Sequence, residues 1–128
     1  MKKVVLFAGV LVSACSGGSS WSEVAKNDDF ADYVNRSTSR KSGSIVRMTS
    51  MRDYAAEQSL EGHSYFSQVD ENEYECREGR WRKLVLVVFP RHKAEGSGHY
   101  IVNQSPQEWS RVPSDGLERT LWTIACDR

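Results

Sequence analysis

Alternation of apolar and polar residues runs through most of this chain and predicts β-strands as its main element. Short runs at residues 21–26 and 30–34 are separated by Asn27-Asp28-Asp29, three residues typical of turns. Residues 44–54 also alternate, but neither set of alternating positions is purely apolar. We therefore expect a long strand there that is only half covered by the core.

The same pattern predicts three further strands, one of which is rich in Val and Leu and is ended by Pro90. These strands are expected at residues 63–76, 81–89 and 99–103. Gly96-Ser97-Gly98 predicts a hairpin loop over residues 91–98. The polar stretch 37–43 predicts a loop, whereas residues 55–62 fit either a helical turn or a loop.

One helix is predicted near the C-terminus. Apolar residues recur there at helical spacing, at Leu117, Leu121 and Ile124. Pro113 precedes the predicted start, and Ser114 or Asp115 can cap it. Such a helix would pack against the sheet and bring Cys126 at its end close to Cys76.

The first residues have the pattern of a bacterial export signal. Two lysines at positions 2–3 precede a mainly apolar run at 4–12, which is too short to cross about 30 Å of hydrocarbon. Val12-Ser13-Ala14-Cys15 then resembles the lipobox of bacterial lipoproteins, in which the Cys is acylated and becomes the new N-terminus. An ordinary signal peptide followed by an unrelated Cys is the alternative. Ser16 is not Asp, the residue linked with inner-membrane retention, which favours the outer membrane.

These signals divide the chain into a lipoprotein signal peptide at 1–14, the lipidated Cys15 with a Gly/Ser tether at 15–20, and one domain at 21–128. Without residues 1–14 the chain carries 15 basic and 17 acidic residues, a balance that disfavours a nucleic-acid-binding protein. No later segment is long and apolar enough to cross a membrane. Membrane contact is therefore expected through the lipid anchor.

Cys76 and Cys126 form the even pair that remains once Cys15 is assigned to lipid. In an exported chain such a pair favours a disulfide, which would close a loop of about 50 residues and stabilise the fold by roughly 4 kcal/mol. Two free buried thiols or a pair of metal ligands are the alternatives. Two isolated cysteines without neighbouring histidines make a poor zinc site.

The sequence carries no catalytic or metal-binding pattern. It has no Gly-x-Ser-x-Gly nucleophile motif, and His63, His92 and His99 do not have the spacing of metal ligands. The acidic residues at 28–32 lack the twelve-residue calcium loop and its distal Glu, which favours a solvated turn. We therefore expect no enzyme activity, no cofactor and no metal site.

Basic residues form two groups that are candidates for binding a partner. The first group is Arg77, Arg80, Arg82 and Lys83, and the second is Arg91, His92 and Lys93. The first group surrounds the start of the strand predicted at 81–89 and the second follows its end, so we expect them near its opposite ends. Four glutamates between residues 71 and 78 would pair with or screen them, and an ordinary solvated strand face is the alternative.

The tryptophans also allow two interpretations. Trp81, Trp109 and Trp122 are predicted to pack in the core, because a small domain needs their buried area. A sugar-binding platform made from the same three rings is the alternative. Four tryptophans in a chain with 39% hydrophobic residues also argue against a disordered protein.

Several motifs, taken together, resemble the surface-adhesin E family of bacterial lipoproteins. They are Trp21, Tyr33-Val34, residues 43–54, Ser64, residues 73–76, Arg80, Arg82, Trp109, Val112-Pro113, Leu121-Trp122 and Ala125-Cys126. The resemblance implies an α+β domain, with an antiparallel sheet of about six strands packed by a C-terminal helix and a Cys76–Cys126 disulfide. The chain departs from the family pattern at 91–98, so a partner bound through that loop could differ from any relative's.

The resemblance also implies a function and a location. The best-known member of the family is an adhesin that binds host extracellular-matrix and serum proteins. We therefore expect a non-enzymatic, lipid-anchored protein of the outer membrane or cell surface that binds a protein partner through exposed loops or a sheet edge. A homodimer through such an edge fits the same pattern. The alternative is a structural or envelope-maintenance lipoprotein that faces the periplasm and has no host ligand.

Overall fold

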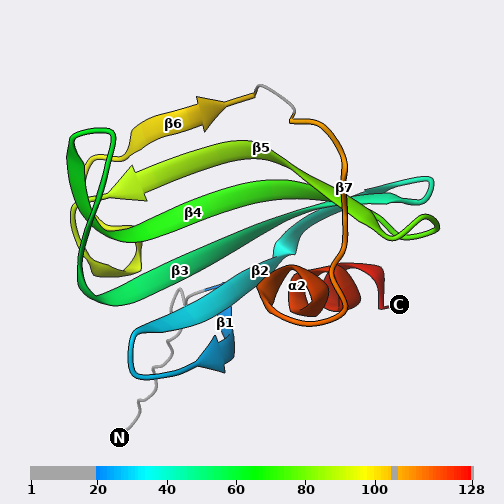
Figure 1. Ribbon diagram of the computed structural model, residues 1–128, viewed down its shortest axis with the longest axis horizontal. Coiled ribbons are helices and arrows are strands. Elements are labelled where there is room, and N and C mark those ends of the chain that lie inside the picture. The colour runs from blue at the N-terminus through cyan, green and yellow to red at the C-terminus, as the bar shows by residue number, and fades with distance from the viewer. Residues whose placement is uncertain (1–19, 105–106, 128) are drawn as a thin grey trace, which may run out of the picture.

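The computed structural model describes residues 20–104 and 107–127, which form one antiparallel sheet with a helix packed against it (Figure 1). Six strands pair in chain order, and a short seventh strand pairs with β5. The strands are β1 (Trp21–Lys26), β2 (Phe30–Ser42), β3 (Ile45–Leu60), β4 (His63–Glu75), β5 (Arg80–Phe89), β6 (His99–Asn103) and β7 (Ser110–Arg111). A 3-10 turn, η1 (His92–Ala94), follows β5, and α2 (Leu117–Cys126) is the C-terminal helix.

The predicted α+β class, antiparallel sheet and C-terminal helix are confirmed. The expected signal peptide, Cys15 and the tether up to residue 19 lie outside the described residues. In the part of the chain that is described, no helix has the length and apolar character needed to span a bilayer.

Two strands are longer than the sequence pattern indicated. β2 continues through residues 37–42, and β3 continues through residues 55–60, so the loop predicted at 37–43 and the loop or helical turn predicted at 55–62 are wrong. Polar side chains are compatible with these strands because backbone groups form the ladder and the side chains at 55–57 face solvent. The register shifts at bulges, between Asn35 and Arg40 in β2 and between Asp53 and Gln58 in β3.

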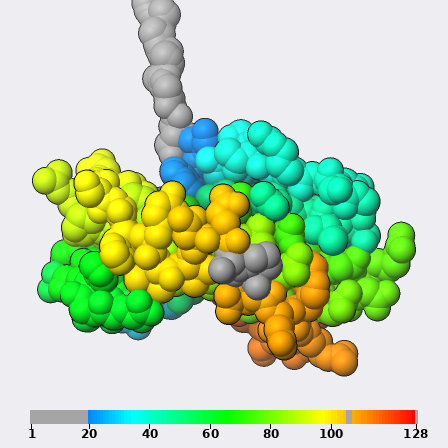
Figure 2. All heavy atoms as spheres, turned by 90° about the horizontal axis from the view of Figure 1, so that it is seen from above, coloured from blue at the N-terminus to red at the C-terminus, as the bar shows by residue number. Residues whose placement is uncertain are grey.

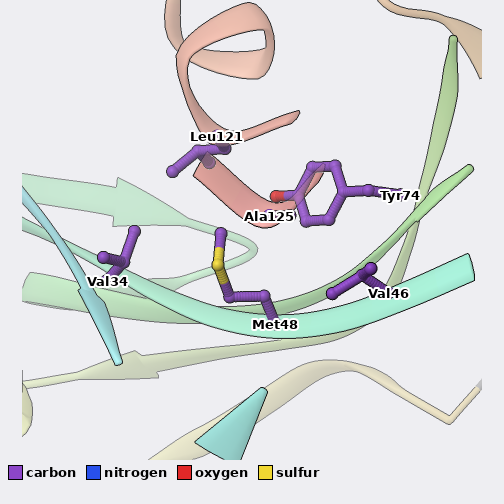
Figure 3. Packing of buried hydrophobic residues seen from close by; sticks show 6 residues of the cluster. All are labelled: Val34, Val46, Met48, Tyr74, Leu121 and Ala125. Atoms are coloured by element: carbon purple, nitrogen blue, oxygen red, sulfur yellow. The ribbon is translucent and has the colours of Figure 1, made fainter. Parts of the chain in front are cut away.

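The hydrophobic core lies between α2 and the sheet face that it covers, here called the helix face (Figure 3). The sheet contributes alternate residues of three strands to it: Val34, Val46, Met48 and Tyr74. Leu121 and Ala125 meet these side chains from α2, and each is at most 2% exposed. One set of alternating positions in residues 44–54 therefore lies in the core, at Val46 and Met48, where α2 covers the strand.

A disulfide and a hydrogen bond hold α2 to the sheet. Cys76, directly after β4, is bonded to Cys126 with the two Cα atoms 5.5 Å apart, which confirms the predicted disulfide. The indole Nε1 of Trp122 donates a hydrogen bond of 3.1 Å to the carbonyl oxygen of Glu75. Both contacts fix the C-terminal half of the helix to the end of the sheet where β4 turns into β5.

The start of α2 differs from the prediction. Gly116 precedes the first helical residue with φ of 93°, and no side chain caps the helix, so Ser114 and Asp115 are not the cap. Glycine adopts such a φ readily because it has no Cβ. The guanidinium of Arg119 instead donates a hydrogen bond of 2.8 Å to the carbonyl oxygen of Pro113, which ties the first turn to the incoming chain.

Polar side chains continue the helix face beyond the hydrophobic core. Asp32 accepts two hydrogen bonds from Arg52, of 2.7 Å from Nε and 2.9 Å from Nη2. Burial alone would lower the pKa of Arg52, but the hydrogen bonds and charge of Asp32 outweigh this effect and raise the pKa. Asp70 in turn binds Lys83 and accepts a 2.9 Å hydrogen bond from the amide of Gln68. These mutually paired groups line a cavity of about 170 Å³ beneath α2.

Candidate partner-binding surface

The basic residues singled out in the sequence lie at the two ends of β5, as predicted. Arg77 lies in the β4–β5 turn, where it lines a hollow with Val46 and Cys126, and residues 91–93 follow the opposite end of the strand. Figure 2 shows the β2–β3 and β4–β5 turns projecting at one end of the molecule, and the 90–98 loop and the β3–β4 turn at the other.

The first group is divided between the two faces of the sheet. Lys83 is opposite Asn72 in the ladder and binds Asp70, so it belongs to the helix face. Arg80 and Arg82 belong to the other face, here called the open face, because α2 does not cover it. Lys83 is thus already neutralised by a carboxylate, whereas the arginines are directed away from the core.

Strand pairing collects arginines from four strands on the open face. One cross-strand row runs from Arg40 of β2 to Arg47 of β3, then to Glu73 of β4 and Arg82 of β5. The next row pairs Arg80 of β5 with Arg111 of β7. We call these five residues the arginine face: Arg40, Arg47, Arg80, Arg82 and Arg111.

A glutamate and a tryptophan order part of the arginine face. Glu73 is 13% exposed and accepts hydrogen bonds from Arg47 at 3.4 Å and from Arg82 at 2.9 Å. The guanidinium carbons of Arg82 and Arg80 lie 4.3 and 5.4 Å from the ring centre of Trp109, within cation–π range. Among the described residues, Arg40 and Arg111 are exposed and form no salt bridge.

Glu75 also lies on the open face, where it is the ladder partner of Arg80. Its carboxylate accepts its hydrogen bonds from Ser44 and Glu78 and not from an arginine side chain. Hydrogen bonds from the hydroxyl of Ser44 and from the backbone N–H of Glu78 lower the pKa of its carboxyl, and the positive charge of Arg80 adds a smaller contribution. Glu71 lies on the same face of β4 as Glu73 and Glu75, and Glu78 lines a hollow with Arg80 and Arg111, so four carboxylates share this surface with five guanidinium groups. The arginine face therefore keeps a net positive charge.

Three of the five arginines were not found by sequence reasoning. Arg40 was placed in a predicted loop, so its pairing with Arg47 across the β2–β3 turn could not be expected. The signal that was available in the sequence is Gly43, since a hairpin turn at residues 43–44 pairs residue 40 with residue 47; in the structure Gly43 has a φ of 62°. Arg111 reaches Arg80 only through β7, a two-residue strand with no pattern of its own.

At the other end of β5, the loop over residues 90–98 is folded onto the sheet. Asp53 of β3 accepts a 2.9 Å hydrogen bond from the backbone N–H of Lys93, and its carboxylate lies 3.1 Å from Nδ1 of His92. The hydroxyl of Ser67 donates to the carbonyl oxygen of Arg91 at 2.6 Å and accepts from the N–H of Ala94 at 2.8 Å.

Gly98 allows the same loop to approach β5 closely. A Cβ at this position would lie 2.6 Å from Cγ1 of Val87 and 2.8 Å from the ring of Phe89. The loop predicted from Gly96-Ser97-Gly98 is therefore present, and its last glycine is required by packing rather than by φ. The basic residues at this end thus lie on a segment fixed by local contacts.

The tryptophans do not all lie in the core. Trp81 and Trp122 pack against the core on the helix face, as predicted. Trp109 does not, because the segment that carries it runs along the edge of β5, where its ring contacts Arg82. The core prediction is confirmed for two rings and wrong for Trp109.

The three histidines of the described chain lie at two separate sites. The rings of His63 and His99 stack with centroids 3.5 Å apart and join the tip of the β3–β4 hairpin to the start of β6. His92 lies against Asp53 and the ring of Phe66. Within residues 20–104 and 107–127, no three His, Cys, Asp or Glu side chains are grouped so that they could hold a metal ion.

Comparisons with known proteins agree with this architecture. The family model described as surface-adhesin protein E matches residues 21–127, almost the whole of the chain that the structure describes. The chain also resembles the structure of crystal form II of Haemophilus influenzae protein E, with a TM-score of 0.68 and 12% sequence identity. That similarity covers 93% of this chain and 96% of the other and concerns the fold. No curated protein sequence matches the chain.

Proposed function

This chain belongs to the surface-adhesin protein E family, and we propose that it is a lipid-anchored adhesin whose arginine face binds a protein partner outside the cell. Its family makes it an adhesin-like protein of the bacterial surface. Of the basic residues near the ends of β5, we assign partner binding to the arginine face, and not to Lys83, to the 91–93 loop or to Arg77, which lines a hollow beside the disulfide.

The observation that carries this assignment is the unbalanced charge of the arginine face. Five arginines from four strands share one surface with four glutamates, and Arg40, Arg80 and Arg111 are exposed. Arginine forks bind planar and tetrahedral anions with two parallel hydrogen bonds, which gives a partner both affinity and register. A host matrix or serum protein with a negatively charged surface would fit this face.

The anchor is proposed from the sequence at the N-terminus. Acyl chains on Cys15 would hold the protein to the outer membrane, and the Gly/Ser tether would place Trp21 and the sheet away from the bilayer. Mass spectrometry of the protein from its native membrane should find an acylated Cys15 and no residues 1–14. A mature chain that still begins with Met1 would overturn the anchor. Protease added to intact cells should remove the domain, and protection until the outer membrane is opened would overturn the surface location.

Binding is tested with the full chain in detergent micelles against immobilised host matrix and serum proteins. The double variant Arg80→Glu and Arg111→Glu reverses the charge of one cross-strand pair, and circular dichroism must show that it is folded, because Arg80 is also the ladder partner of Glu75. We expect it to weaken capture of the partner by roughly tenfold. The matched control is Arg91→Glu with Lys93→Glu, which makes the same charge change at the other end of β5. Equal loss in both variants would overturn the assignment to the arginine face.

A further inference from the structure

The arginine face contains like charges held directly opposite each other. Arg40 is the ladder partner of Arg47, and Arg80 is the ladder partner of Arg111. Such pairs destabilise an antiparallel sheet, because the two side chains extend side by side over one surface. Glu73 already binds Arg47, and Glu75 is the ladder partner of Arg80, so an external anion would neutralise the other member of each pair, Arg40 and Arg111.

The arrangement of these charges fits an extended ligand. Neighbouring strands are about 4.8 Å apart, so the row from Arg40 through Arg47 to Arg82 spans roughly 14 Å across the sheet. The Arg80–Arg111 pair lies two residues further along β5, about 7 Å from that row. A single phosphate or carboxylate could contact one or two of these groups only. A linear chain with several anionic groups could contact all of them.

Part of the surface is ordered before any ligand binds. Glu73 lies beneath Arg47 and Arg82 and bonds to both, while the ring of Trp109 supports the guanidinium of Arg82 at 4.3 Å. Ordering of long side chains before binding reduces the entropy that binding must remove. Arg40 and Arg111 form no salt bridge in the described chain, and apart from the Nη1 of Arg40, which donates to the carbonyl oxygen of Ser39 at 3.3 Å, their donors are available to a ligand.

We propose that the arginine face binds a sulfated polysaccharide chain, such as those attached to extracellular-matrix proteins. The inference rests on the proposed function and specifies which part of the partner contacts this surface. Each sulfate group offers three outward oxygens and a charge that persists at any physiological pH, which suits the fixed positive charge and forked donors of arginine. The repeating sulfates of such a chain would lie across the strands, along the row of arginines.

Two other polyanions fit the surface less well. Single-stranded nucleic acid is bound through aromatic rings on which successive bases stack, whereas the arginine face contacts one ring, Trp109, already faced by Arg82. The chain as a whole carries no net charge, unlike a protein that binds nucleic acid through its total field. An acidic folded protein would present its carboxylates on a rigid surface, and would have to match two rows of arginines at once.

The probe for this proposal is heparin, measured by calorimetry with the full chain in detergent micelles. We expect binding that weakens as salt is raised, and that is lost when the heparin is chemically desulfated. The Arg80→Glu and Arg111→Glu variant should bind roughly tenfold more weakly. The Arg91→Glu and Lys93→Glu variant should bind like the unchanged protein. Circular dichroism of both variants shows whether each is folded.

The competing ligands are decisive arms of the same experiment. Binding of desulfated heparin or poly-glutamate as tight as that of heparin would overturn the proposal in favour of a general acidic ligand, and equal binding of duplex DNA would overturn it in favour of any polyanion. If heparin does not bind but immobilised matrix proteins are still captured through Arg80 and Arg111, the proposed function stands and this inference fails. If heparin binds and no matrix or serum protein does, the inference stands and the protein partner fails.

Discussion

Basic residues lie at both ends of β5, but different parts of the structure position them at each end. At the Arg80 end the side chains come from four strands, and the disulfide fixes α2 behind them. At the Arg91 end the basic residues are consecutive and lie on one loop, which Asp53 and Ser67 bind through its backbone. One surface is built by pairing distant segments, and the other by folding a single segment onto a strand.

This difference shows why a cluster of charges in a sequence is a weak guide to a binding surface. Residues 91–93 are conspicuous because they are adjacent, yet a carboxylate from β3 already contacts His92. Arg40, Arg47 and Arg111 are inconspicuous because they are far apart, yet the ladder places them on one face with Arg80 and Arg82. The comparison can be tested by weakening each end separately.

The largest effect is expected at the Arg80 end, when Cys76 and Cys126 are both changed to Ala. The free energy of unfolding should fall by about 4 kcal/mol, because the open chain gains the entropy of a 50-residue loop. Denaturant titration measures the loss. Hydrogen exchange should accelerate more around the β4–β5 turn than in the 90–98 loop. Equal acceleration at both ends would contradict the view that the disulfide supports one end in particular.

The next effect is expected at the opposite end, with Gly98→Ala. The new methyl group would collide with Val87 and Phe89, so we expect stability to fall by roughly 2 kcal/mol, as in other overpacked sites. Ser97→Ala, at an exposed neighbouring position, is the matched control and should change little. If urea unfolding gives the same midpoint for both variants, the loop does not pack on β5 as described.

A smaller effect is expected from Asp53→Ala, which removes the acceptor for Lys93 N–H and the partner of His92. We expect a loss of about 1 kcal/mol, with faster amide exchange at Lys93 while heparin binding stays unchanged. Glu57→Ala, an exposed position on the same strand, serves as the control. A change in heparin binding by Asp53→Ala would show that the two ends are coupled rather than independent.

The smallest effect concerns the pH dependence at the Arg80 end. The pKa of Glu75 is lower in the folded protein than its ordinary value of 4.5, so the folded state gains stability above that pH and loses it as the pH falls through the folded pKa. Glu75→Gln should remove this part of the acid destabilisation, and Ser44→Ala should reduce it by removing one donor. Unfolding measured from neutral to acid pH checks this. Parallel curves for the three proteins would show that the carboxylate does not favour the fold.

Most of the strands could be predicted from alternation, and the errors have one cause. The pattern is informative where one face of a strand is buried, as at Val46 and Met48. It fails at 37–42 and 55–60, where the strands extend past α2 and most side chains are exposed, so no buried face imposes an alternating pattern. Trp109 was wrongly placed in the core, because a tryptophan in a small domain is expected to be buried there. In the structure its ring instead lies against the guanidinium groups of Arg80 and Arg82.

The sequence by itself determined the elements that depend on local pattern or on counting. These include the alternating strands, the helix spacing at 117–124 and the even cysteine pair, whereas the N-terminal signal with Cys15 stays a prediction. Only the tertiary structure decided which arginines share a surface, because a face of an antiparallel sheet is set by register between segments that are tens of residues apart. It also decided that Lys83 binds Asp70, whereas Arg40 and Arg111 form no salt bridge within the described residues, since a charge has a partner only where the fold brings one.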